Sequence, residues 1–144
     1  MFDATNQVNH WLHERSPGAE LDDDGVAGLE RDAQTVIVLE VPAGSEVCHL
    51  YAAVAPLPED ALEPALTAAL SLNRFGRPLG GCWLAWDPDI HMLTLCHNLH
   101  VPATDALAFN NTLDNFIGSL DSARAMFTAP PAQSDAEFRA TFWE

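Results

Sequence analysis

The sequence predicts an α+β fold: a single domain with one twisted antiparallel sheet and helices packed on it, in the order helix, three strands, helix, two strands, helix. Apolar residues follow helical spacing in three segments and strand-like patterns in five. The connections between consecutive strands are short, which favours antiparallel neighbours. We expect this domain to cover residues 1–129, followed by a C-terminal tail of uncertain order over residues 130–144.

The first helix is expected near the N-terminus and should end at Ser16-Pro17-Gly18. Asp3 or Thr5 can cap it, because either side chain can accept a hydrogen bond from a free backbone N–H of the first turn. One face of this helix is apolar, since its hydrophobic residues recur at i+3 and i+4 spacing. These residues are Ala4, Val8, Trp11 and Leu12.

Two further helices follow the same reasoning. The middle helix should begin near 61–63, because Pro64 is tolerated only in a first turn. The last helix opens with Thr104 as its cap and continues until Pro130-Pro131 stops it. Its buried stripe is expected to contain Phe109, Leu113, Phe116, Ile117, Leu120 and Phe127.

Five extended runs complete the pattern. Three of them, near 25–31, 35–41 and 46–54, are separated by turn residues and predict a three-stranded meander. Two more, about 82–87 and 92–100, predict a hairpin around a type I turn that contains Pro88.

The charge balance limits the partners. The chain has 21 acidic residues, six arginines and no lysine, which gives a formal net charge of −15. Nucleic-acid phosphates and anionic membranes attract basic surfaces, so neither is expected as a partner. The charge favours solubility and partners that are basic or that expose apolar segments. The N-terminus lacks a signal peptide, and the three cysteines lack CxxC spacing, so a reducing cytoplasm is expected.

The segment 81–100 concentrates thiols and imidazoles, which are the side chains that most often bind zinc. Their spacing does not match a zinc finger or ribbon, and neighbouring strand residues point to opposite faces of a sheet. Ordinary hairpin residues explain them better. The residues in question are Cys82, His91, Cys96, His97 and His100.

Calcium and catalysis are also not expected. Aligning Glu20, Asp22, Asp24 and Gly25 with a calcium loop places Arg31 where the bidentate glutamate should be. The sequence also lacks GxSxG, HExxH and a glycine-rich phosphate loop. We therefore expect no metal, no cofactor and no catalytic residue.

The paired tryptophans of the hairpin point to an interface. Trp83 and Trp86 stand three apart on a short strand, so they face opposite sides of the sheet. Either a helix of the chain covers the second face or a partner does, and tryptophan is enriched where partners bind.

In its element order and acidity, the chain resembles the class I type III secretion chaperones, the Tir-chaperone (CesT-like) family. The similarity covers residues 1–127 and includes the apolar first helix and the later segments "GVAGLERDAQTVIVLEV", "LTAALSLNRFG", "GGCWLAWDPDIHMLTLCHNL" and "ALAFNNTLDNFIGSLDSAR". The resemblance implies a bacterial cytoplasmic homodimer that binds the N-terminal segment of a secreted effector. That segment would stay extended and be handed to the secretion apparatus, whose ATPase is a further candidate partner.

The resemblance also assigns residues to two surfaces. The effector would contact the first helix and the first strand, through Val8, Trp11, Leu12, Val26 and Leu29. The dimer seam would lie on the middle helix and fourth strand, at Leu66, Leu70, Trp83 and Trp86.

Two alternatives stay open at this point. One is a regulatory binder of the same fold that sequesters a secretion regulator. The other is a small α+β enzyme that uses cysteine and histidine residues of the 82–100 hairpin.

Overall fold

A computed structural model of the protein describes residues 2–33, 35–74 and 78–128. The expected C-terminal tail, residues 130–144, and the proline pair that should stop the last helix lie outside these described residues. None of the helices in the described ranges has the length and apolarity needed to span a bilayer.

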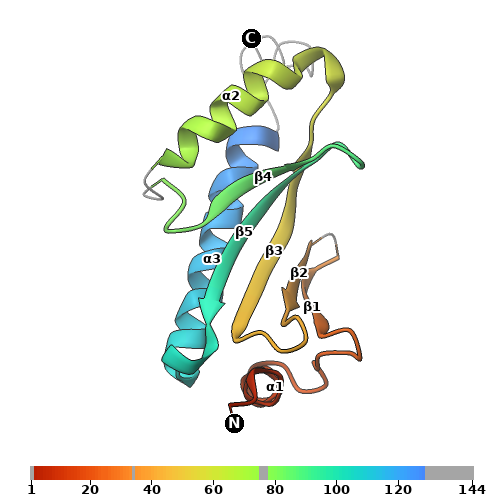
Figure 1. The fold of residues 1–144 in the computed structure, drawn as a ribbon. Coiled ribbons are helices and arrows are strands. Elements are labelled where there is room, and N and C mark those ends of the chain that lie inside the picture. The colour runs from red at the N-terminus through yellow and green to blue at the C-terminus, as the bar shows by residue number, and fades with distance from the viewer. Residues whose placement is uncertain (1, 34, 75–77, 129–144) are drawn as a thin grey trace. The chain divides into compact units, whose positions relative to one another are not determined.

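The predicted order of elements is confirmed (Figure 1). Two short 3-10 helices, η1 and η3, accompany the three main helices and five strands. In chain order the elements are α1 (Ala4–Arg15), β1 (Val26–Asp32), β2 (Thr35–Glu40), β3 (Val47–Pro56), η1 (Glu59–Ala61), α2 (Leu62–Leu72), β4 (Trp83–Asp87), β5 (Met92–His100), η3 (Val101–Ala103) and α3 (Ala106–Thr128).

The five strands form one sheet in the order β1-β2-β3-β5-β4, so β1 and β4 are its edge strands. β1 pairs antiparallel with β2, with Val26 opposite Glu40 and Leu29 opposite Ile37, and the register shifts between Glu30 and Asp32. β2 pairs antiparallel with β3. The meander and the hairpin expected from the sequence therefore join in a single sheet.

The chain divides into two compact units, which we describe separately. Among the described residues, the first unit comprises residues 2–33, 35–52 and 96–115, and the second comprises residues 53–74, 78–95 and 116–128. β3, β5 and α3 contribute residues to both units.

Each unit has its own set of buried apolar side chains. In the first unit these come from α1, β1 to β3, the end of β5, η3, the start of α3 and the connections next to them: Ala4, Val8, Trp11, Leu12, Leu21, Ala27, Ile37, Leu39, Val41, Cys48, Leu50, Ala52, Leu99, Val101, Phe109 and Leu113. In the second unit they are Val54, Ala55, Leu57, Ala65, Ala69, Leu79, Cys82, Leu84, Leu93, Leu95, Phe116, Leu120, Ala123 and Phe127.

The caps of α1 and α3 show how local sequence sets the helix starts. Asp3, and not Thr5, caps α1, because its carboxylate accepts from the Asn6 N–H at 3.0 Å. The expected Thr104 cap of α3 is off by one residue: Asp105 Oδ1 accepts from the Ala108 N–H at 2.8 Å. The Thr104 hydroxyl instead donates to the His100 carbonyl, which holds the turn that precedes the helix.

Candidate interaction surfaces

The apolar face of α1 is buried within the first unit. Val8 and Leu12 have no exposed area and Trp11 is 3% exposed. The Trp11 ring packs against the Phe109 ring of α3 with 5.1 Å between the ring centres and 32° between the planes. These three residues are therefore buried in the described structure, with Trp11 against Phe109 of α3, and their role in client binding stays a prediction.

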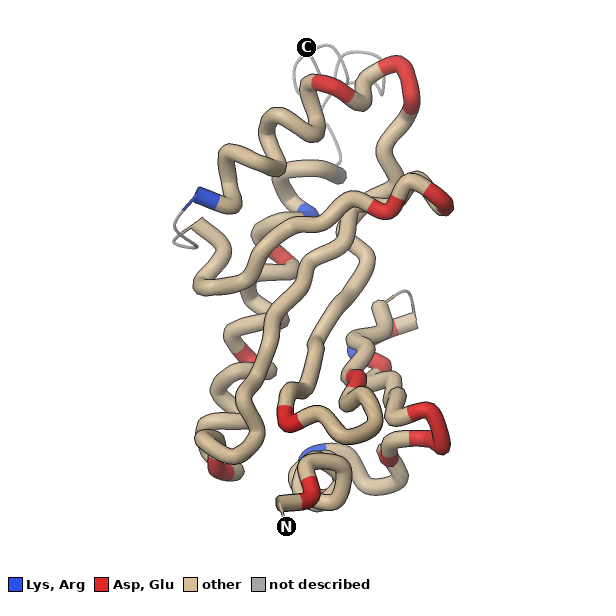
Figure 2. The backbone as a smooth tube through the Cα atoms, in the orientation of Figure 1, with Lys and Arg blue, Asp and Glu red and all other residues tan. Residues whose placement is uncertain are grey.

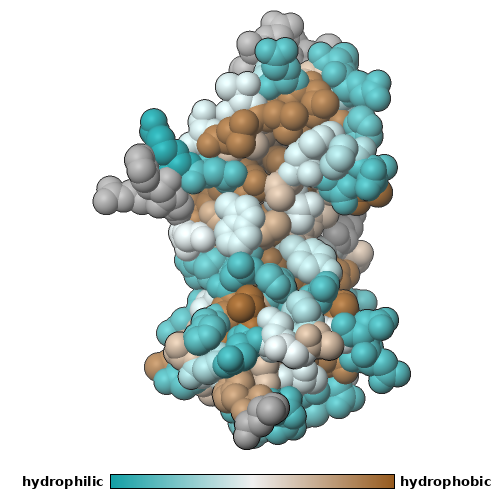
Figure 3. All heavy atoms as spheres, viewed as in Figure 1, coloured by the Kyte–Doolittle hydropathy of each residue, from teal (hydrophilic) through white to brown (hydrophobic). Residues whose placement is uncertain are grey.

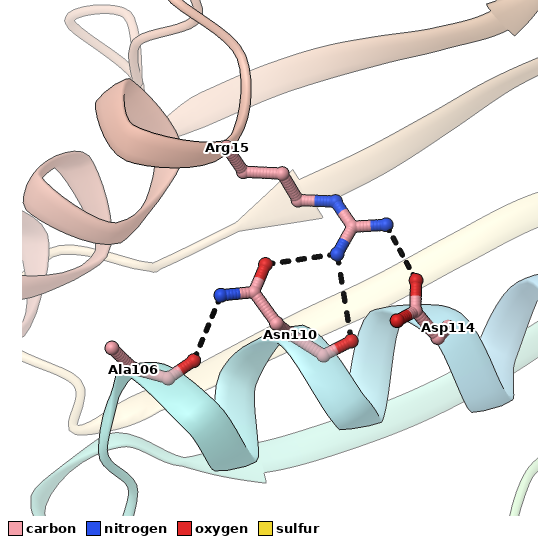
Figure 4. Close-up of polar contacts among 4 residues, drawn as sticks. All are labelled: Arg15, Ala106, Asn110 and Asp114. Atoms are coloured by element: carbon pink, nitrogen blue, oxygen red, sulfur yellow. Dashed lines mark hydrogen bonds and ion pairs between the residues drawn. The ribbon is translucent and has the colours of Figure 1, made fainter.

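A polar contact fixes the C-terminal end of α1 on α3 within the same unit (Figure 4). Arg15 donates from Nη1 to the Asn110 side-chain oxygen at 2.8 Å and from Nη2 to the Asp114 carboxylate at 2.7 Å. Asn110 is itself oriented by its bond to the Ala106 carbonyl. Arg15 is thus occupied inside the fold, and the sequence pattern gave no sign of this long-range pairing.

The other two residues assigned to client binding lie on the edge strand β1 and are partly exposed. Leu29 points to the same side as the buried Ala27, while Val26 points to the opposite, outer side. Next to them on β2, Val36 is 47% exposed and Val38 is partly exposed. The outer side of β1 and β2 therefore presents apolar surface beside an open sheet edge.

The middle of the sheet's outer side is polar in the first unit. The Tyr51 hydroxyl donates to the Glu40 carboxylate at 2.9 Å, and His49 lies 2.7 Å from the Asn98 side-chain oxygen. Burial and the nearby Glu40 carboxylate raise the pKa of Tyr51, so its hydroxyl stays protonated and remains a donor. These bonds join neighbouring strands and leave Val36 and Val38 as the apolar part of this surface.

In the second unit, the residues assigned to the dimer seam are exposed to different degrees. Leu70 of α2 is 71% exposed and Trp83 of β4 is 37% exposed, whereas Leu66 and Trp86 are half-buried. Figure 3 shows apolar surface over α2. Asn73, at the end of α2, bonds to the backbone of Leu84 in β4 and joins the two elements. α2 and β4 thus present apolar side chains that the described part of this unit does not cover.

The cysteines and histidines of the hairpin do not assemble into a reactive site. Burial raises the pKa of the Cys82 thiol, and burial raises that of Cys48 to about 12, so both thiols stay protonated near neutral pH. His91 stands at the hairpin turn, edge-on to the Trp86 ring with 5.5 Å between centres. Within the described ranges, no three histidine, cysteine, aspartate or glutamate side chains come together as metal ligands would.

Two surface hollows lie in the first unit. One, of about 310 Å³, is lined by polar residues of α1 and by Glu20. The other, of about 540 Å³, lies between the start of α1 and the turn at Gly44–Glu46. Neither is lined by a cysteine or by a nucleophile paired with a base.

An α+β domain with an open sheet edge and apolar patches on strands and helix has the features of a protein that binds polypeptides. The comparisons with known proteins agree. The chain belongs to the Tir chaperone protein (CesT) family, whose model matches residues 15–124. It is therefore a type III secretion chaperone, a binding protein and not an enzyme, and the resemblance seen in the sequence is confirmed.

Solved structures with the same fold include complexes of such chaperones. One chain of the ExsC-ExsE complex is 25% identical, with a TM-score of 0.74 over 92% of this chain and 100% of that chain. One chain of the HopA1-SchA chaperone-effector complex is 11% identical, with a TM-score of 0.67 over 83% of this chain and 91% of that chain. The Yersinia pestis chaperone SycH in complex with a fragment of YscM2 is 16% identical, with a TM-score of 0.64 over 84% and 99%. A search of curated proteins finds no match.

Proposed function

We propose that this chaperone works in the bacterial cytoplasm and binds the N-terminal segment of a secreted effector. It keeps that segment extended, soluble and ready for type III secretion. Family membership supports the general role, and the HopA1-SchA structure is described as a chaperone-effector complex. The charge of −15 fits a protein that must stay soluble while it exposes apolar surface.

The observation that carries the proposal is the open edge of the sheet at β1. An extended polypeptide can add to such an edge through backbone hydrogen bonds, while alternate side chains contact the neighbouring surface. Here the outer side offers Val26 and Val36, and the opposite side of β1 offers the partly exposed Leu29. Leu29 and Val26 keep their proposed role in client binding, as residues beside the added segment.

Two copies of the chain are proposed to associate through α2 and β4. An isologous interface needs one patch that can meet its own copy, and most soluble homo-oligomers use two-fold symmetry. Leu70 and Trp83 are large apolar side chains exposed on these adjacent elements, with Leu66 and Trp86 partly exposed beside them. Burying them between two copies would remove apolar area from water.

A direct titration tests client binding. Synthetic N-terminal segments of effectors secreted by the same bacterium are added to the wild-type chain, to Leu29→Ala and to an exposed control, Ile90→Ala. Leu29→Ala should weaken binding by about 1–3 kcal/mol, the usual range for an interface anchor. Ile90, on the hairpin turn, should have no effect. If no effector segment binds the wild-type chain, effector escort is wrong.

A second candidate is a regulatory binder of the same fold, which holds a secretion regulator in place of an effector. The likeness to one chain of the ExsC-ExsE complex over 92% of this chain supports a role in which the chain holds one protein partner. The same binding surfaces would serve either role. A stoichiometric partner that is never secreted would favour the regulatory role, whereas transfer of the partner to the secretion-apparatus ATPase would favour escort.

A further inference from the structure

The edge strand β4 has a sequence that does little to keep other chains from pairing with it. Its first four residues, WLAW, are apolar and uncharged. Figure 2 shows acidic residues at the hairpin turn that follows β4 and none along the strand before that turn. An apolar edge strand without charge or proline is a typical site of pairing between copies of a protein. Its protection must therefore come from another part of the fold.

The backbone groups of Leu84 show which way β4 exposes its pairing groups. The Leu84 N–H donates to Asn73 Oδ1 at 2.7 Å, and the Leu84 carbonyl accepts from Asn73 Nδ2 at 2.9 Å. The only strand beside β4 in the sheet is β5, so Leu84 directs these groups to the free edge. Backbone groups alternate in direction along a strand, and Cys82 and Trp86 therefore share the direction of Leu84.

The side chain of Asn73 occupies the place of a neighbouring strand at this edge. A primary amide offers one acceptor and two donors, so it can satisfy both backbone groups of Leu84 at once. Asn73 is the C-terminal cap residue of α2, and its own N–H donates to the Ala69 carbonyl at 3.2 Å. An incoming strand cannot pair with Leu84 unless the end of α2 moves away.

A second tie holds the segment that leads into α2. The Leu57 N–H donates to the His91 carbonyl at 3.0 Å, and His91 Nε2 lies 3.7 Å from a carboxylate oxygen of Glu59 in η1. His91 has a φ of +51°, a left-handed conformation that non-glycine residues rarely adopt. Such a conformation persists where surrounding contacts hold it. The hairpin turn and the start of α2 are thus joined.

Between these two ties α2 lies alongside β4 (Figure 1). The buried residues of α2 are Ala65 and Ala69, whose small side chains permit a close approach to the neighbouring backbone. Covering an edge strand with a helix is one of the ways in which proteins prevent edge-to-edge pairing.

We infer that α2 is a cover for the β4 edge, fixed by Asn73 at one end and by the hairpin turn at the other. The cover prevents β4 from pairing with the same strand of a second copy of the chain. This role is separate from client binding and from the proposed dimer seam, which uses the outward side chains of α2 and β4.

The cover matters because β1 is the other edge of the same sheet. A sheet with two edges that can pair is able to join copies edge to edge without limit. Closing β4 restricts contacts between copies to side chains, which favours an assembly of finite size over an open-ended one.

Amide hydrogen exchange of the ¹⁵N-labelled full chain tests the cover without any substitution. The Leu84 amide should exchange at least about tenfold more slowly than the amide of Ile90 in the exposed hairpin turn, because Asn73 holds the Leu84 N–H. Equal exchange rates at Leu84 and Ile90 would overturn the inference.

Two substitutions of Asn73 separate its hydrogen bonds from its packing. Asn73→Ala should speed exchange at Leu84 about tenfold and leave the buried Leu93 amide of β5 unchanged. Asn73→Asp keeps an acceptor for the Leu84 N–H, so exchange at Leu84 should stay slow. Equal acceleration by both substitutions would mean that the side-chain bond does not close the edge, and would overturn the inference.

Self-association is measured in a chain that carries Leu70→Asp, so that the exposed leucine of α2 cannot drive it. Light scattering at submillimolar concentration should show larger species for Asn73→Ala/Leu70→Asp than for Leu70→Asp alone. The matched control, Asn111→Ala/Leu70→Asp, should behave as Leu70→Asp does. In the larger species the Trp86 amide should become protected from exchange, because it lies on the edge that pairs.

Two results of this experiment would overturn the inference. One is a chain with Asn73→Ala and Leu70→Asp that keeps the circular dichroism of wild type and associates no further than Leu70→Asp alone. The other is association that leaves the Trp86 amide unprotected, which would place the contact away from β4.

Discussion

The side-chain amide of Asn73 bonds both backbone groups of Leu84: its Oδ1 accepts from the Leu84 N–H at 2.7 Å, and its Nδ2 donates to the Leu84 carbonyl at 2.9 Å. Asn73 is the C-terminal cap residue of α2, and Leu84 is a buried residue of the edge strand β4. One side chain therefore replaces a missing neighbouring strand at that position and ties α2 to β4.

Replacing Asn73 with alanine should lower the free energy of unfolding by about 1–3 kcal/mol, because two backbone groups of Leu84 lose their partner. Urea denaturation followed by circular dichroism measures the change. Asn111→Ala, at an exposed position on α3, is the matched control and should stay within about 0.5 kcal/mol of wild type. A loss of similar size in both variants would contradict the role given to Asn73.

Leu70→Asp should separate the proposed dimer. The side chain is 71% exposed, so aspartate costs little in a single copy but would place a charge in the seam between two copies. Light scattering should give twice the 15.6 kDa chain mass for wild type and a single chain mass for the variant. Leu107→Asp, at an equally exposed leucine on α3, should remain dimeric. A wild-type monomer at micromolar concentration would refute the dimer itself.

Trp11→Ala should act on stability. The ring is buried against Phe109, so its removal should cost about 3–5 kcal/mol, the range for deleting a large aromatic side chain from a core. Chemical denaturation measures the cost, and Val36→Ala, at an exposed position, provides the comparison. An unchanged midpoint for Trp11→Ala would mean that α1 is not held on α3 as described.

Gly25→Ala should be more damaging than Gly44→Ala, although both glycines have φ angles near +80°. At either site, alanine in the left-handed region costs about 1–2 kcal/mol. At Gly25 the added Cβ would also clash with the Val41 carbonyl oxygen, whereas nothing lies within 4 Å at Gly44. Thermal unfolding of the two variants compares them directly, and equal melting temperatures would contradict the packing of Gly25 on β2.

The thiols should differ in reactivity. Thiolate is the reactive form, and burial holds the pKa of Cys48 at about 12, so Cys48 should resist alkylation at pH 8 until the chain unfolds. The partly exposed Cys96 should react first. Mass spectrometry of the alkylated chain identifies the order. Because the unfolded thiol ionises near its ordinary value of 9.0, the stability that Cys48 contributes should decline as pH rises from 9 toward 12.

The fold was predictable because local signals agreed with one another. The alternating residues of 35–41 predicted the strand β2, and the position of Pro64 predicted where α2 begins. The Asp-Pro turn predicted the hairpin of β4 and β5. The cap of α3 was displaced by one residue because Thr104 and Asp105 are both good cap formers. The distance in sequence from either residue to the first apolar residue of the helix does not show which of the two is the cap.

The interaction surfaces were harder to predict because helical periodicity identifies an apolar face without saying what covers it. Trp11 lies on such a face, but its cover is Phe109, which comes from a helix at the other end of the chain. The same holds for the partners of Arg15 on α3. The bond from the Val26 N–H to the Asp22 carboxylate is likewise a contact that composition and spacing do not reveal.

The use of arginine inside the fold has a consequence for the colloidal behaviour of the protein. Arg15 pairs with Asp114, and Arg124 donates to the Ala53 carbonyl, so two of the six arginines are held against the chain's own groups. The field around the molecule is then set by its carboxylates, and neighbouring molecules repel one another. As acid brings the solution toward the isoelectric point near 4.4, that repulsion fades while apolar surface such as Leu70 remains exposed. We therefore expect the protein to precipitate on acidification and to redissolve when the pH is raised, because charge repulsion is what keeps molecules with exposed apolar surface apart.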